Sequence, residues 1–134
     1  MAENPRPRPH VDSDTRPFWE GTRAGELRLQ RCRHCARVIF YPRSLCPECM
    51  SDDIEWFVAS GKGSIHSFVV VHRAPPGFQD HVPYVVALVN LVEGPRMMSR
   101  ITGADPTSVE VGQSVTVVFE SLDEEITLPL FRQS

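Results

Sequence analysis

The stretch 31–49, RCRHCARVIFYPRSLCPEC, holds all four cysteines of the chain in two pairs of identical spacing. Two residues separate the cysteines within each pair, and ten residues separate the pairs. A tight turn over two residues can aim both thiolates at one point, and backbone N–H groups of the same turn relieve the negative charge on sulfur. The pattern therefore predicts a tetrahedral metal site whose ligands are Cys32, Cys35, Cys46 and Cys49.

Zinc is the metal that best suits four thiolates, and a closed four-sulfur site is structural because catalytic zinc keeps an open position. Iron in a rubredoxin-like site is the alternative, since four thiolates also hold iron. Two disulfides are disfavoured in a reducing cytoplasm, and a thioredoxin-like redox site would need one pair in a βαβ setting. His34 lies inside the first pair, but four sulfurs already complete the site, so we expect its side chain to be exposed.

Two features depart from the commonest form of this motif. The linker of ten residues is short, which predicts a short hairpin between the pairs. Ala36 and Met50 follow the pairs at positions where a glycine would turn most easily.

Residues 27–58 contain few large apolar groups. We therefore expect this module to unfold without its metal, whose binding is worth about 10–16 kcal/mol in zinc-finger peptides.

Strand-like segments surround the cysteines and fill the rest of the chain. Short strands are expected at 27–31, 38–41 and 54–58, which makes the cysteine region a small β module. Beyond Gly61 and Gly63, turn residues separate five longer strands, expected at 64–72, 84–92, 96–101, 114–120 and 126–131. Five strands of this kind predict a small barrel. The chain then divides into a disordered arm at 1–12, a helical segment at 13–26, the ribbon at 27–60 and the barrel at 61–134.

The N-terminal region joins a proline-rich arm to a short helix. Three prolines among the first nine residues prevent regular structure in the arm. Ser13 or Asp14 can cap a helix that carries two bulky residues, Phe18 and Trp19. These rings can pack on their own domain or face a partner, because aromatic side chains serve both purposes.

Composition narrows the class of protein further. A chain of 134 residues has room for one core of ordinary size, and 41% hydrophobic with 23% charged residues is typical of a globular protein. The formal net charge of -3 gives no positive field that would attract nucleic acid. The apolar runs are too short to cross a bilayer, and the N-terminus lacks the apolar segment of a signal peptide. We expect a cytoplasmic protein without a membrane partner.

The sequence contains no recognised catalytic constellation. It has no Gly-x-Ser-x-Gly, no phosphate-binding glycine loop and no His-Glu-x-x-His, and its four cysteines belong to the metal site. We therefore expect a protein that is not itself an enzyme. A single-strand nucleic-acid binder would carry aromatic and arginine side chains along one barrel face, and only Phe68, Tyr84, Arg96 and Arg100 are available for it. This interpretation is disfavoured.

Blocks of sequence, taken in order, resemble one family. They are PFWEG at 17–21, the cysteine stretch at 31–49, and the barrel segments PYVVALVNLVEGPRMMSRITG at 83–103 and VGQSVTVVF at 111–119. Over residues 18–131 the chain is similar to the bacterial and archaeal family that joins a rubredoxin-like zinc ribbon to an OB-fold. The resemblance implies a mainly β fold: a short N-terminal helix, the zinc ribbon and a five-stranded OB-fold barrel.

The resemblance also implies a function. Members of the family are non-catalytic companions of acyl-CoA enzymes, chiefly thiolase-like proteins, including thiolases that act as aldolases in steroid side-chain degradation. The family's metal ligands correspond to the four cysteines. Its partner-facing helix corresponds to Pro17, Phe18, Trp19 and Glu20, and its variable loop after the first barrel strand, which could border the partner's substrate channel, to Pro75, Pro76, Gly77 and Phe78.

Three functions stay open at this point. The first is an accessory subunit, in a hetero-oligomer, of a thiolase or retro-aldolase of steroid side-chain or fatty-acyl degradation. The second is a free-standing acyl-CoA-binding protein, in which Arg73, Arg96 and Arg100 are the candidate contacts for the phosphates of CoA. The third is a module that binds single-stranded nucleic acid.

Overall fold

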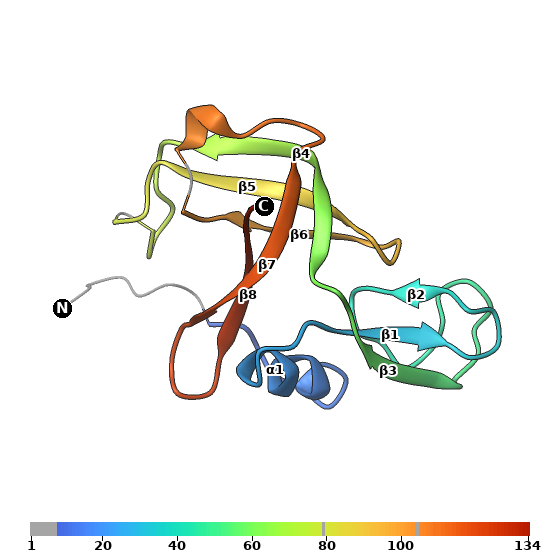
Figure 1. Ribbon diagram of the computed structural model, residues 1–134. Helices are drawn as coiled ribbons and strands as arrows, with labels where there is room; N and C mark the ends of the chain where they lie inside the picture. The colour runs from blue at the N-terminus through green and yellow to red at the C-terminus, as the bar shows by residue number, and fades with distance from the viewer. Residues whose placement is uncertain (1–7, 79, 104) are drawn as a thin grey trace.

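The computed structural model describes residues 8–134 with the exception of 79 and 104, and it is mainly β (Figure 1). The expected strands are found within two residues of their predicted ends. The elements are α1 (Arg16–Arg23), β1 (Arg28–Cys32), β2 (Val38–Ile39), β3 (Ile54–Val58), β4 (Lys62–Val71), β5 (Tyr84–Leu91), β6 (Arg96–Ile101), a 3-10 turn (Pro106–Ser108), β7 (Ser114–Ser121) and β8 (Thr127–Gln133). The sequence did not predict the 3-10 turn.

The first three strands form the ribbon, a small antiparallel sheet in the order β2-β1-β3. In Figure 1 it stands apart from the larger sheet, with the loops that carry the cysteines at its far end. β1 lies in the centre because it pairs with β3 along its whole length, from Arg28 opposite Val58 to Cys32 opposite Ile54. The pairing with β2 is shorter, from Gln30 opposite Ile39 to Arg31 opposite Val38.

The last five strands close into a barrel in the order β4-β5-β6-β8-β7, which confirms the predicted barrel. Neighbours are antiparallel except β6 and β8, which pair in parallel at Ile101 and Phe131. β4 pairs with β5 on one side and with β7 on the other, and Gly63 takes part in both pairings. A Cβ atom on Gly63 would lie 2.6 Å from the carbonyl oxygen of Asn90, so only glycine allows this approach.

The helix α1 lies between the two modules and contacts β1, β7 and β8. It begins one or two residues later than predicted: Thr15 occupies the N-cap position, so the expectation of a Ser13 or Asp14 cap is wrong. Asp12 explains the shift, because its side chain accepts a hydrogen bond from the backbone N–H of Thr15 at 2.9 Å and so stabilises the turn that precedes the helix. Phe18 points into the chain's own core and is 5% exposed.

One apolar core runs through both modules. The buried side chains of the barrel continue without a break into Phe18 of α1 and into Leu27 and Leu29, which lie at the base of β1. The far end of the ribbon has only a second, small cluster, made of Cys32, Ile39 and Cys46. The base of the ribbon is therefore held by ordinary apolar packing, whereas its far end has little of it.

The arm predicted at 1–12 is described only in part, because residues 1–7 lie outside the described residues. Arg8 forms ion pairs with Asp123 and Glu125, each at 2.8 Å, and so connects the start of the described chain to the turn between β7 and β8. The one helix of the described residues is too short to span a membrane.

We expect the effect of a substitution in the barrel on the free energy of unfolding to depend on the burial of the side chain rather than on the residue type. Val85 on β5 is 1% exposed, whereas Val69 on the neighbouring strand β4 is 61% exposed. Val85→Ala should lower the free energy of unfolding by about 2 kcal/mol, because it removes buried methyl groups and leaves a cavity. Val69→Ala, the matched control, should change it by less than about 0.5 kcal/mol. Urea unfolding monitored by tryptophan fluorescence measures both, and equal effects would contradict the register of the barrel.

Candidate functional site

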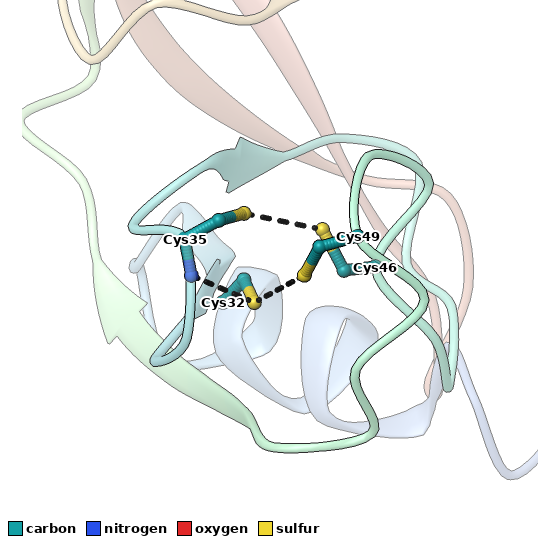
Figure 2. A group of neighbouring side chains, drawn as sticks. All are labelled: Cys32, Cys35, Cys46 and Cys49. Carbon is teal, nitrogen blue, oxygen red and sulfur yellow. Dashed lines mark hydrogen bonds between the residues drawn. The ribbon is translucent and has the colours of Figure 1, made fainter.

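The four cysteines meet at the far end of the ribbon. Their sulfur atoms all lie within 4.8 Å of one another. The Sγ atoms of Cys32 and Cys49 are 3.6 Å apart, and those of Cys35 and Cys46 are 3.5 Å apart (Figure 2). A tetrahedral site with metal–sulfur bonds of about 2.3 Å has sulfur–sulfur edges of roughly 3.8 Å. The structure thus positions the sulfur atoms of all four predicted ligands to bind one metal ion.

Two matching turns place these sulfurs. The N–H of Ala36 donates to the carbonyl oxygen of Cys32, and the N–H of Met50 donates to that of Cys46, both at 2.9 Å. The sulfur of the first cysteine in each turn also accepts a backbone N–H, that of Cys35 at 3.5 Å and that of Glu48 at 3.4 Å. These N–H groups stabilise negative charge on sulfur, as a thiolate ligand requires.

Ala36 and Met50 adopt the left-handed backbone conformation, with φ of 65° and 63°. These are the two positions at which the sequence lacks the expected glycine. Both turns thus have the left-handed conformation that favours glycine, although neither residue is glycine. This indicates that the convergence of the sulfurs determines the conformation at these two positions.

The thiols are electrostatically unequal. Burial raises the pKa of Cys46, but the N–H groups of Cys49 and Glu48 and the neighbouring thiols outweigh it and lower that pKa to about 7. The N–H of Ser51 lowers the pKa of Cys49, yet burial and the three neighbouring thiols together raise it to about 12. Four thiolates at this spacing would repel one another, so that all four can be deprotonated only when a cation lies between them.

Polar contacts around the cysteines hold the linker between the pairs. Gln30, which is 4% exposed, donates through Nε2 to the carbonyl oxygen of Arg43 at 3.0 Å and accepts the N–H of Arg43 through Oε1 at 2.9 Å. Arg37 pairs with Glu48 at 2.7 Å and so joins the two turns. His34 is exposed, as predicted, and is not part of the cysteine cluster. The sequence analysis did not predict that Gln30 holds the linker. The only signal for it was a polar residue within a short predicted strand.

A second candidate site is a largely apolar groove of about 510 Å³ beside the ribbon. It brings together sequence-predicted residues from three regions: Phe18 and Trp19 of α1, Phe78 of the β4–β5 loop and Arg100 of β6. The remaining lining residues are Thr15, Phe40, Tyr41 and Pro42 from the N-terminal half and Tyr84, Val86, Met97, Met98, Ser99, Leu128, Pro129 and Leu130 from the barrel. Sequence analysis did not single out Tyr41 or Met98, although both are large apolar residues that are more than half exposed.

Other predicted site residues lie outside this groove. Pro17 and Glu20 of α1 do not line it, and neither do Pro75, Pro76 and Gly77 of the loop. Pro75, Pro76 and Glu20 are exposed, whereas Gly77 is buried.

The three arginines proposed as CoA contacts do not gather at one place. Arg96 donates to the side chain of Asn90 at 2.7 Å and lines a different cleft of about 460 Å³, between the ribbon and the β5–β6 hairpin. Arg100 is four residues further along β6, which corresponds to about 13 Å, and lines the apolar groove. Arg73 is exposed and lines neither cavity.

A four-cysteine ribbon followed by a closed five-stranded barrel defines a two-module protein of the ribbon and OB-fold class. Comparison with known proteins agrees: residues 19–55 match the model of the ChsH2 rubredoxin-like zinc ribbon domain, and residues 56–120 match that of the ChsH2 C-terminal OB-fold domain. The chain belongs to the ChsH2 family, which confirms the resemblance.

Relatives of this chain carry several names. A DUF35 domain-containing scaffold protein of Methanothermobacter thermautotrophicus is 44% identical over 96 residues, which are 71% of this chain and 72% of the relative. A probable enoyl-CoA hydratase alpha subunit of Thermomonospora curvata is 38% identical over 128 residues, but these 95% of this chain correspond to only 40% of that protein. A more distant relative, 29% identical over 82 residues (61% of this chain and 56% of the relative), is the benzoylsuccinyl-CoA thiolase subunit BbsA of Thauera aromatica.

A solved structure supports the same assignment. A chain of the structure described as the Ltp2-ChsH2(DUF35) aldolase superposes with a TM-score of 0.85 at 36% identity. The superposition covers 94% of this chain and 98% of the other. The similarity therefore extends over both modules, including the way in which ribbon and barrel are joined.

We expect metal removal to disorder the far end of the ribbon before the barrel. After treatment with a strong chelator, backbone amides of β2 and of the two cysteine turns should lose protection from hydrogen exchange, because little apolar packing holds them. Amides of β5 should keep theirs. Cys46→Ser should have the same effect in the presence of metal, whereas His34→Ala should not. Unchanged exchange after elemental analysis has shown loss of metal would contradict a structural role.

The left-handed residues give a second prediction. Ala36→Gly and Met50→Gly should each raise the free energy of unfolding of the metal-loaded protein by up to about 1 kcal/mol, because glycine adopts positive φ without steric strain. Ala24→Gly is the control, since Ala24 has a φ of -84° at the end of α1 and should gain nothing. Urea unfolding at saturating metal measures all three. A loss of stability in the two turn variants would show that φ is not positive there.

Proposed function

We propose that this chain is a non-catalytic accessory subunit of a thiolase-like acyl-CoA enzyme, a thiolase or a retro-aldolase, with which it forms a hetero-oligomer. The observation that carries the proposal is the superposition over both modules with a chain of the Ltp2-ChsH2(DUF35) aldolase. The names of further relatives, a scaffold protein and a thiolase subunit, point to the same kind of assembly. Steroid side chains and fatty acyl chains are the substrate classes we propose for the complex.

We further propose that the metal is zinc and that its role is structural. Four sulfur donors at tetrahedral spacing match the closed type of zinc site, which offers no position for water or substrate. Iron would fit the same four thiolates and is the alternative. When bound, the metal supplies charge that keeps Cys32, Cys35, Cys46 and Cys49 as thiolates, and the chain's own turns then hold the ribbon in shape.

The described side chains support a non-catalytic role. The groove is lined by one ionisable group that is charged at neutral pH, Arg100, and by no histidine, cysteine or carboxylate among the described residues. A histidine–hydroxyl contact does occur, between His66 and Ser67 at 3.1 Å, but neither residue lines the groove. Because a nucleophile needs a base that is itself oriented by a third group, this contact between sequence neighbours does not make a catalytic site.

Neither alternative function is favoured by an observation. A free-standing acyl-CoA carrier would need cations that converge on the phosphates, and its three candidate arginines are dispersed. A nucleic-acid-binding barrel would need a continuous aromatic and basic face, whereas Tyr84 and Arg100 line the groove and Phe68 and Arg96 do not. The hydratase name belongs to a relative of which this chain matches 40%, so it does not assign a hydratase activity here.

Co-expression tests the proposed function directly. The tagged chain should co-purify in fixed stoichiometry with a thiolase-like enzyme encoded beside it, with about one zinc per chain by elemental analysis. The enzyme should lose activity or solubility when it is expressed without this chain. Cleavage or condensation of an acyl-CoA by the isolated chain would contradict the non-catalytic role. Failure of every neighbouring thiolase-like protein to bind would contradict the partner.

A further inference from the structure

The groove has two aromatic walls that come from different modules. One wall joins α1 to the ribbon: the ring of Phe18 packs edge-on against Trp19 at 5.0 Å and against Phe40 at 5.7 Å, and Phe40 in turn contacts Tyr41 at 4.7 Å. The other wall joins the β4–β5 loop to the barrel, where the ring of Phe78 lies 5.5 Å from Tyr84. The two walls face a common space of about 510 Å³.

Arg100 is the one charged side chain among the described residues that line this space. Its guanidinium group lies over the ring of Tyr84, 5.3 Å from the centroid. Its Nε atom is buried and has no hydrogen-bond partner among the described residues, and Arg100 takes part in none of the ion pairs found there. A buried guanidinium donor without an acceptor is unfavourable, so the site is incomplete as it stands.

The rim of the groove is exposed although it is apolar. Tyr41 is 57% and Met98 59% exposed, and they stand on opposite modules, the ribbon and β6. Tyrosine, tryptophan, methionine and arginine are the residue types enriched at the centre of protein–protein interfaces, and Tyr41, Trp19, Met98 and Arg100 supply all four in this groove. The composition therefore favours a protein segment over a small molecule as the occupant.

We propose that the groove receives an apolar segment of the partner enzyme that carries one carboxylate, and that this carboxylate pairs with Arg100. The proposal rests on the proposed function, since it identifies the surface by which that partner binds. The charge complementarity is specific: one guanidinium in an apolar surround selects one acidic side chain and rejects a basic one. The cation–π contact with Tyr84 orients the guanidinium group, whose donors can bind a carboxylate by two hydrogen bonds.

Two groove variants test the proposal in complexes with the purified partner. Arg100→Gln should weaken binding by 10-fold to 100-fold, because it leaves the partner's carboxylate buried without a counter-charge. Met98→Asp should weaken it at least as strongly, because it adds a like charge beside that carboxylate. Arg96→Gln and Val69→Asp are the matched controls: they make the same changes on β6 and β4 at exposed positions outside the groove, and they should bind as the wild type does. Circular dichroism and thermal unfolding check that all four variants fold, and isothermal titration calorimetry gives the dissociation constants.

The outcomes separate this proposal from the proposed function. If the wild-type chain binds no thiolase-like partner, the proposed function fails. If the wild type binds it and both groove variants bind as well as their controls, the accessory role stands and the groove is not the interface. Dodecanoate serves as a probe for a small-molecule occupant. Dodecanoate binding that Arg100→Gln abolishes, together with unchanged partner affinity in both variants, would overturn the proposal in favour of a small carboxylate ligand.

Discussion

The convergence of four sulfurs on one point is the constraint on which the far half of the ribbon depends. That half has a cluster of only three buried apolar side chains, two of which are the cysteines Cys32 and Cys46. Ala36 and Met50 adopt unfavourable left-handed conformations in the turns that direct the thiols toward this point. A metal ion held by four thiolates contributes enough free energy to offset such strain, and the apolar packing at this end does not.

The effect of the metal site reaches beyond the ribbon. The linker between the two cysteine pairs carries Phe40 and Tyr41, and the two hydrogen bonds between the side chain of Gln30 and the backbone of Arg43 hold the same linker. These two rings and Pro42 form the ribbon's share of the groove. A metal bound by the four cysteines would therefore act on the groove indirectly, by holding a loop whose aromatic side chains form part of one wall.

The sequence was informative where the signal was local. Cysteine spacing predicted the ligands, and alternation bounded by glycine and proline predicted the strands to within two residues. The N-cap of α1 was predicted one or two residues too early because the side chain of Asp12, outside the expected cap, stabilises the preceding turn. The groove could not be predicted from spacing, since it depends on the position of α1 between the modules, and Arg96 and Arg100 look equivalent in the sequence although they line different cavities. Likewise, consecutive methionines on β6 separate into one that is 2% exposed and one that is 59% exposed, because strand geometry sends neighbours to opposite faces.

The two-module architecture has a consequence for the accessory role that we propose. The two modules share one core through Phe18, Leu27 and Leu29, so ribbon and barrel are packed against each other at the base. A segment that occupies the groove would touch α1, the ribbon linker and the barrel at once, and by linkage it would stabilise that arrangement over any other. The free energy of docking would then hold the two modules in one orientation, as the proposed accessory role requires. A bound metal and the shared core would set the shape of this surface, and Arg100, the one charged side chain among the described residues that line the groove, would select the partner segment.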